Sequence, residues 1–146
     1  MVDGDKKITR RVRAEARRRG VKITLVLDFI HALEYLWKAA HVFFDEGTPE
    51  IEAWVLEQLE RMMEGRIGHV VAGMTRMATV RGLSAKERAP VDKAASYLLK
   101  RSRKEMMRYD ELLALGAPIA TGVIEGACRH LISDRMDPTG ARWRLP

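Results

Sequence analysis

The fold predicted for this chain depends on one stretch, Val21-Lys22-Ile23-Thr24-Leu25-Val26-Leu27. This stretch is short, rich in β-branched residues and almost entirely apolar, which is typical of a strand buried on both faces. It is the one convincing strand in the sequence. Because a lone strand leaves its backbone N–H and C=O groups unsatisfied, we expect a partner strand, either outside this chain or at residues 1–4.

Helical patterns account for most of the remaining sequence. A basic helix is expected over residues 6–19, ended by Gly20 in the left-handed conformation that often closes a helix. After the strand, Asp28 is placed to cap a helix that continues to about residue 44. Further helices are expected at 48–64, 67–80, 109–115 and 123–135, and another is expected to open at Ser84 and to carry Ala94, Tyr97 and Leu98. The predicted fold class is mainly α, with one β-strand or with two.

The overall composition indicates a globular protein. The chain has 146 residues, of which 47% are hydrophobic and 32% charged. No apolar run approaches the roughly 18 residues that a membrane span needs, and no signal peptide is visible. The single cysteine, Cys128, excludes an internal disulfide framework and a zinc site built from cysteines. We therefore expect a cytoplasmic protein with no membrane partner.

The net charge of +6 is concentrated at one end of the chain. Residues 1–22 hold nine Lys or Arg and three Asp or Glu, whereas the other 124 residues hold 17 of each sign. Such a cluster predicts a polyanionic partner, nucleic acid first. The alternative interpretation is a solvated helix face without a partner.

Two constellations of residues carry candidate chemistry. Asp28 and His31 are three residues apart where the predicted strand meets a helix, a place where α/β sites tend to lie. The alternative is that Asp28 caps the helix and His31 is half-buried. Glu125 lies among small residues in the first turns of the predicted helix at 123–135, where a substrate can approach closely. Its alternative role is to complement the helix dipole.

Two further features have two interpretations each. Asp3 and Asp5 flank Gly4, and they are placed to cap a helix, to bind a cation or to sit at the end of a strand. Trp143 lies between Arg142 and Arg144, so its ring either anchors a core or stacks on a nucleic acid base.

Three stretches together resemble a known family. They are Val2-Asp3-Gly4-Asp5, then Asp28-Phe29-Ile30-His31-Ala32-Leu33-Glu34-Tyr35-Leu36-Trp37, and finally residues 118–143, PIATGVIEGACRHLISDRMDPTGARW. In this order they are similar to transposases of bacterial insertion sequences of the Kra type, distant relatives of the Mutator-like group. The resemblance covers nearly the whole chain.

This resemblance implies a DDE transposase, and with it the C-terminal part of a ribonuclease H-like α/β catalytic domain carrying an all-helical insertion. Residues 1–44 then form the second half of the core, 45–116 the insertion, and 117–146 the catalytic-glutamate helix and tail. Two Mg²⁺ or Mn²⁺ ions are held by carboxylates, among them Asp3 as the second catalytic aspartate and Glu125 as the catalytic glutamate. Asp28 is the alternative to Asp3. The residues expected to support the site are Asp28, His31, Arg135 and Trp143.

The expected function is that of a fragment of a DNA transposase, whose full-length form cleaves and transfers phosphodiester strands with two metal ions. The family's first catalytic aspartate has no counterpart here, so we expect no activity from the chain alone. A second copy or an upstream transposase product is an expected partner, beside the DNA of insertion-sequence ends. Phosphate contacts are expected from Arg10, Arg11, Arg17, Arg18, Arg19, Arg129 and Arg142. The alternatives are a non-enzymatic, basic helical module that binds nucleic acid and a non-functional remnant.

Overall fold

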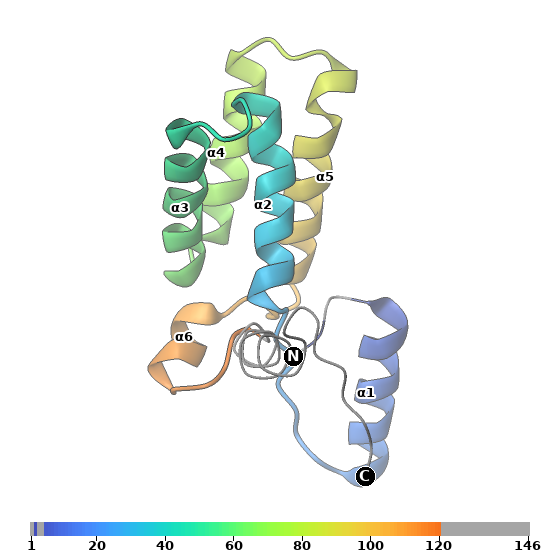
Figure 1. Ribbon diagram of the computed structural model, residues 1–146. Helices are drawn as coiled ribbons and strands as arrows, with labels where there is room; N and C mark the ends of the chain where they lie inside the picture. Colours follow the sequence, from blue (N-terminus) through green and yellow to red (C-terminus); the bar gives the residue numbers. More distant parts are fainter. Residues whose placement is uncertain (1, 3–4, 121–146) are drawn as a thin grey trace, which may run out of the picture.

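Helices dominate the part of the chain that the structure describes. The structure is a computed structural model, and it describes residue 2 and residues 5–120. Among these residues it contains the six helices α1 (Lys6–Arg19), α2 (Phe29–Phe43), α3 (Pro49–Met63), α4 (Ile67–Val80), α5 (Ala85–Ser102) and α6 (Tyr109–Ala114) (Figure 1).

The four long helices α2 to α5 form a bundle. Helix α2 packs against α3 and α5, and α4 packs against the same two helices, so the four close around a common core (Figure 1). Apolar residues at helical spacing fill it, and those that are almost fully buried include Leu36, Ile51, Met62, Val70, Met74 and Leu98. Burying a side chain of this size contributes about 1.5–3 kcal/mol. The bundle therefore supplies the main core of the described chain.

Capping residues position the ends of these helices. The Asp28 carboxylate accepts a hydrogen bond from Ile30 N at 3.0 Å, so Asp28 caps α2 as the sequence predicts. Ser84 and Glu87 form the predicted capping box at the start of α5. Thr48 precedes α3 without a capping hydrogen bond from its side chain, and its hydroxyl instead donates to the Asp45 carbonyl at 2.9 Å.

The predicted fold class is wrong. Over the described residues there is neither a strand nor a sheet, and the helical bundle replaces the α/β domain of the ribonuclease H-like type. Residues 21–26 form no regular secondary structure, although their trace follows an extended course (Figure 1), and among the described residues the pairing at the end of this stretch is one isolated parallel bridge between Val2 and Leu27. Val2 N donates to Val26 O and Asp28 N donates to Val2 O, both at 2.9 Å.

The physical reason lies in where the apolar surface is buried. The β-branched composition favours an extended backbone for residues 21–27, but a sheet also requires neighbouring strands. The helices α2 to α5 bury their apolar faces against one another, so the core forms without a sheet. Only the end of the extended stretch joins it, because Val26 and Leu27 are buried whereas Val21 is 53% and Ile23 42% exposed.

Several segments meet at the base of the bundle, around Leu27. Its N–H donates to Met106 O at 2.8 Å, and its carbonyl accepts a hydrogen bond from the Tyr109 hydroxyl at 3.1 Å. The backbone N–H of Phe29 donates to the Ile119 carbonyl oxygen at 2.9 Å. Burial raises the pKa of the Tyr109 hydroxyl, and the negative charge of Asp28 adds to the effect.

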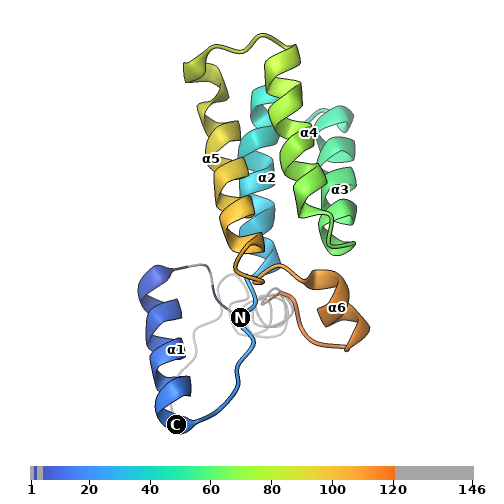
Figure 2. The ribbon, with the colours of Figure 1, turned by 180° about the vertical axis from the view of Figure 1, so that it is seen from behind.

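Helix α1 stands beside this base, apart from the bundle (Figure 2). Ala16 is the single buried residue within α1. The extended stretch connects this helix to α2. Most residues of α1 are exposed. In the described part of the chain, no helix is long and apolar enough to cross a membrane.

Candidate nucleic-acid interface

Helix α1 carries the basic cluster, and local interactions explain why it forms. The Asp5 carboxylate accepts hydrogen bonds from Lys7 N at 2.5 Å and from Ile8 N at 3.0 Å. Gly20 ends the helix with a φ of 65°, a conformation that glycine adopts without strain. The last turn, Arg17–Arg19, places positive charge at the negative end of the helix dipole.

Four cations of α1 lie on one face of the helix. Lys6, Arg10, Arg13 and Arg17 follow one another at intervals of three or four residues, the spacing of neighbours along a helix surface. Together with the C-terminal end of α5 and the turn after it, they line a hollow of about 400 Å³, here called the basic hollow. Its lining residues are Lys6, Thr9, Arg10, Arg13, Arg17, Arg101, Lys104 and Met106.

Among the described residues, the lining of the basic hollow includes six cations and no carboxylate. Arg101 is 9% exposed, and its guanidinium carbon lies 4.7 Å from the centre of the Tyr97 ring. The other five cations are exposed. Within the described residues, no carboxylate forms an ion pair with Arg10, Arg13 or Arg17. Cations held together in this way create a positive potential that attracts a polyanion.

The other side of α1 is partly neutralised. The Glu15 carboxylate forms ion pairs with Arg18 at 2.6 Å and with Arg19 at 2.5 Å. The hydrogen bond from Arg18, followed by that from Arg19, holds the pKa of Glu15 below its usual range. The positive potential of α1 is therefore strongest on the face that lines the basic hollow.

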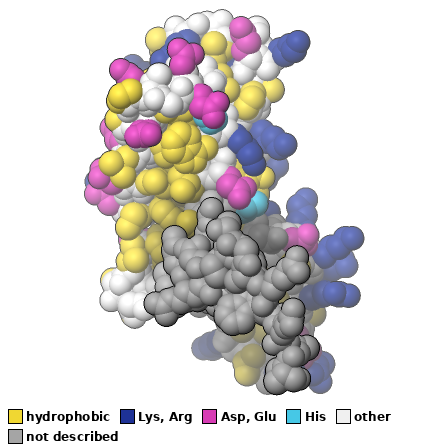
Figure 3. Space-filling model, viewed as in Figure 1, with side chains coloured by type: hydrophobic (Ala, Val, Ile, Leu, Met, Phe, Trp, Pro, Cys, Tyr) yellow, Lys and Arg dark blue, Asp and Glu magenta, His cyan; other side chains and the backbone are white. Residues whose placement is uncertain are grey.

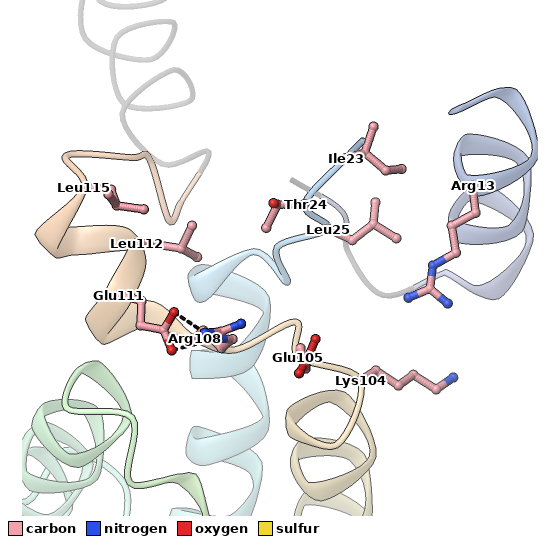
Figure 4. Close-up of a pocket in the computed structure, with 10 residues that line it drawn as sticks. All are labelled: Arg13, Ile23, Thr24, Leu25, Lys104, Glu105, Arg108, Glu111, Leu112 and Leu115. Carbon is pink, nitrogen blue, oxygen red and sulfur yellow. Dashed lines mark hydrogen bonds and ion pairs between the residues drawn. The ribbon is translucent and has the colours of Figure 1, made fainter. Parts of the chain in front are cut away.

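A second hollow, of about 300 Å³, adjoins the first and shares Arg13 and Lys104 with it (Figure 4). Its lining also includes two carboxylates, those of Glu105 and Glu111. Arg108 donates to Glu111 through Nε at 2.7 Å, and this hydrogen bond raises the pKa of the Arg108 guanidinium. Because its charges are mixed and partly paired, this hollow is less suited to a polyanion than the basic hollow.

Asp28 and His31 have separate surroundings. Asp28 is 8% exposed and caps α2, as described above. The His31 ring packs edge-on against Tyr35 and Tyr97, with centroids 5.6 and 5.8 Å away, and its Nδ1 lies 3.4 Å from a Glu34 carboxylate oxygen. These contacts are those of a helix cap and of a half-buried histidine, the alternatives that the sequence left open.

The remaining predicted catalytic residues lie outside the described residues. These are Asp3 and Glu125, expected as metal ligands, together with Arg135 and Trp143. Within residues 5–120 and Val2, no group of three or more His, Cys, Asp or Glu side chains is arranged to hold a metal ion. The described residues alone therefore do not make up a two-metal site, and the expected Mg²⁺ or Mn²⁺ stays a prediction.

The structure also distributes the predicted phosphate contacts over different places. Arg10 and Arg17 line the basic hollow, Arg11 and Arg19 lie on the opposite face of α1, and Arg18 pairs with Glu15. The two others, Arg129 and Arg142, are outside the described residues.

Four cations of the basic hollow were missing from that prediction, namely Lys6, Arg13, Arg101 and Lys104. The spacing of Lys6 and Arg13 relative to Arg10 and Arg17 was a usable signal, because it places all four on one helix face. The contribution of Arg101 and Lys104 depends on how α5 ends beside α1, and the sequence gives no local sign of that arrangement.

Comparisons with known proteins leave the family open. No protein-family model, no curated protein and no solved structure matches this chain. The similarity to Kra-type transposases therefore stays a prediction from the residues quoted for it.

Proposed function

We propose that this chain binds DNA through the basic hollow, as part of a DNA transposase of the DDE class. One observation carries the DNA-binding part: six cations from two separate segments line one hollow, and no carboxylate of residues 5–120 lines it with them. The transposase part is supported by the three stretches of sequence that resemble the Kra type. The proposal includes a cytoplasmic location, where a bacterium keeps its DNA.

The arrangement of the cations suits a phosphate backbone. From Lys6 to Arg17 the cationic face of α1 extends over about 16 Å, because an α-helix rises about 1.5 Å per residue. Duplex DNA carries about nine phosphate charges over the same length, at one charge per about 1.7 Å. Contacts of this kind fix the protein on the duplex without reading its sequence. The proposed binding is thus independent of DNA sequence and sensitive to salt.

The catalytic part of the proposal involves residues outside the described region. Asp3 and Glu125 would hold Mg²⁺ or Mn²⁺, with Asp28 as the alternative to Asp3. Two such ions stabilise the attacking and leaving oxygens of a phosphodiester displacement. Since the described residues do not complete this site, the proposal assigns them DNA binding and no catalytic step.

A second candidate function is a non-enzymatic helical module that binds nucleic acid. The four-helix bundle favours it, because a bundle replaces the α/β domain that the transposase family implies. Both candidate functions use the basic hollow to bind nucleic acid. They differ in Glu125, which holds a metal ion in the transposase and has no catalytic role in the module.

Binding and cleavage are tested separately. Fluorescence anisotropy with a labelled duplex of arbitrary sequence measures DNA binding, and polyglutamate of similar charge serves as a competitor. We expect the duplex to bind and polyglutamate to compete poorly. Equal competition would show that this surface binds any polyanion without a preference for DNA. Nicking of a supercoiled plasmid with Mg²⁺ or Mn²⁺ then tests for a complete catalytic site. Nicking that Glu125→Gln abolishes supports an active transposase, whereas nicking at background level is expected of the transposase fragment and of the module alike.

A further inference from the structure

Helix α1 has an apolar face on the side opposite the basic hollow. Ile8 is 47% and Val12 37% exposed, and they lie one helical turn apart. Val12 and Ala16 join the extended stretch after the helix to line a hollow of about 430 Å³, here called the apolar groove. Its lining residues are Arg11, Val12, Glu15, Ala16, Arg19, Val21 and Ile23. An amphipathic helix usually buries such a face, and here the face is exposed.

Arginine side chains border the apolar groove. Arg11 and Arg19 lie at its rim, and Glu15 lies between them. Glu15 is already paired with Arg18 and Arg19, so the net charge at the rim is positive. The groove is therefore suited to an apolar ridge that carries carboxylates on its flanks.

The chain itself carries a ridge of this kind on α3. Leu56 is 58% and Met63 40% exposed, and they lie seven residues apart on one face of the helix. Glu52 and Glu60 flank Leu56, one turn before it and one turn after it. The segment from the α2–α3 turn to the end of α3, residues 45–64, holds seven acidic residues and one arginine.

The two surfaces lie far apart on one molecule. Helix α3 is at one side of the bundle and α1 is beside its base, on the opposite side (Figures 1 and 2). In Figure 3 lysine and arginine side chains gather at the lower right, over α1, whereas many carboxylates lie over the upper part and the left of the molecule. Complementary surfaces at opposite ends of a molecule meet only between copies.

We propose that the apolar groove of one copy binds the exposed acidic face of α3 in a second copy. The ridge of Leu56 and Met63 enters the groove beside Val12 and Ile23, and Glu60, which lies between the two ridge residues, approaches Arg11. The helices match in size, since α1 with 14 residues and α3 with 15 are each about 21–22 Å long. The contact joins different surfaces of the two copies, so it is head-to-tail.

This arrangement leaves the basic hollow accessible, because that hollow lies on the other face of α1. Copies joined head-to-tail therefore present several basic hollows to one duplex. Since the contact involves one face of one helix from each copy, we expect it to be weak and concentration-dependent, at the low end of specific interfaces.

Sedimentation velocity without DNA tests the inference independently of the proposed function. The wild-type chain is expected to associate with rising concentration, and raising the salt concentration from about 0.05 to 0.5 M should weaken association about tenfold through screening. Arg11→Glu and Glu60→Lys should each weaken it by about tenfold, a factor that corresponds to a modest loss of electrostatic attraction. Lys86→Glu, with the charge change of Arg11→Glu but on α5, should leave it unchanged.

Mixing the two charge variants identifies the pairing. The Arg11→Glu chain keeps an intact α3 and the Glu60→Lys chain keeps an intact groove, so an equimolar mixture should form a 1:1 dimer that does not grow further. The double variant Arg11→Glu/Glu60→Lys should associate again. Val12→Ser and Leu56→Ser test the apolar part of the contact, and each should weaken association about tenfold as well. Circular dichroism confirms that every variant keeps its helices.

Three results would overturn the inference. The first is a wild-type chain that stays monomeric at every concentration reached. The second is association that Glu60→Lys leaves at the wild-type level, as a contact between two α1 helices predicts. The third is a loss of association in Lys86→Glu equal to that in Arg11→Glu, which would indicate a general effect of net charge.

Discussion

Neutralising the cations on the face of α1 that lines the basic hollow tests most directly how DNA is bound. The triple variant Arg10→Gln/Arg13→Gln/Arg17→Gln removes three of the five exposed cations that line the basic hollow. Glutamine is a good helix former and the three side chains are exposed, so α1 should keep its structure. A circular dichroism spectrum equal to that of the wild type checks this assumption.

The expected magnitude follows from counterion release. A protein that neutralises Z phosphates shows a slope of about −0.9Z when the logarithm of its affinity is plotted against the logarithm of the salt concentration. Five phosphate contacts give a slope of about −4.5, and the two left in the triple variant give about −1.8. Between about 50 and 200 mM salt, the wild type should lose about 500-fold in affinity and the triple variant only about tenfold.

Fluorescence anisotropy over a salt series measures both slopes with the same labelled duplex. The matched control is Arg76→Gln/Lys86→Gln/Lys93→Gln, which removes the same number of charges from α4 and α5, away from the basic hollow. We expect the control to keep a slope near that of the wild type. Equal slopes for the triple variant and the wild type, or equal losses in variant and control, would refute the assignment of DNA binding to the basic hollow.

Three further predictions concern the stability of the fold, each measured as the free energy of unfolding in urea. Asp28→Ala removes the cap of α2 and should cost about 1 kcal/mol, so an unchanged midpoint would contradict its capping role. Leu36→Ala in the bundle core should cost about 2–5 kcal/mol, whereas the exposed Leu56→Ala should stay within about 0.5 kcal/mol of the wild type. Tyr109→Phe removes a buried hydrogen bond and should cost about 1 kcal/mol at neutral pH.

The raised pKa of Tyr109 also predicts how the free energy of unfolding changes at alkaline pH. Its pKa is raised in the folded chain, so above about pH 10 the unfolded state releases a proton that the folded state still holds. The stability contributed by the neutral hydroxyl is present below that pH and is lost as the pH rises. The alkaline fall in stability should therefore be smaller in Tyr109→Phe, and an equal fall in both proteins would contradict this role.

Local sequence signals predicted the helices well because helix ends are set by neighbouring residues. Gly20 ends α1, Asp28 caps α2, and Ser84 with Glu87 opens α5, all as expected. Each of these interactions joins residues no more than four positions apart. Such signals are readable from one sequence, and they predicted both ends of α1 and α2 and the start of α5 to within about two residues.

The strand was mispredicted because pairing is not a local property. Residues 21–27 have the composition of a buried strand, but residues 21–26 form no regular secondary structure and Leu27 makes only an isolated bridge. Whether an extended stretch becomes part of a sheet depends on which other segments lie beside it. In this structure Leu27 meets Met106 and Tyr109, residues about 80 positions away, and these contacts anchor the stretch to a helical base.

Only part of the candidate interface was predicted, because the rest depends on how distant segments lie beside one another. The charge of α1 and the spacing of its cations are local, so the helix was recognised as a polyanion-binding candidate. Which face of α1 lines a hollow together with α5 depends on where α5 ends, and that arrangement joins segments far apart in the sequence. The sequence expectation therefore included Arg11 and Arg19, which lie on the opposite face of α1, and missed Lys104, which lines the basic hollow.

The most direct test of DNA binding by the basic hollow is an NMR titration of the arginine side-chain Nε–Hε signals with a short duplex. The signals of Arg10, Arg13 and Arg17 should shift with a common binding curve, while those of Arg76 and Arg81 on the bundle stay in place. Signals of the basic hollow that do not move, or bundle arginines that move as far, would contradict the proposed interface.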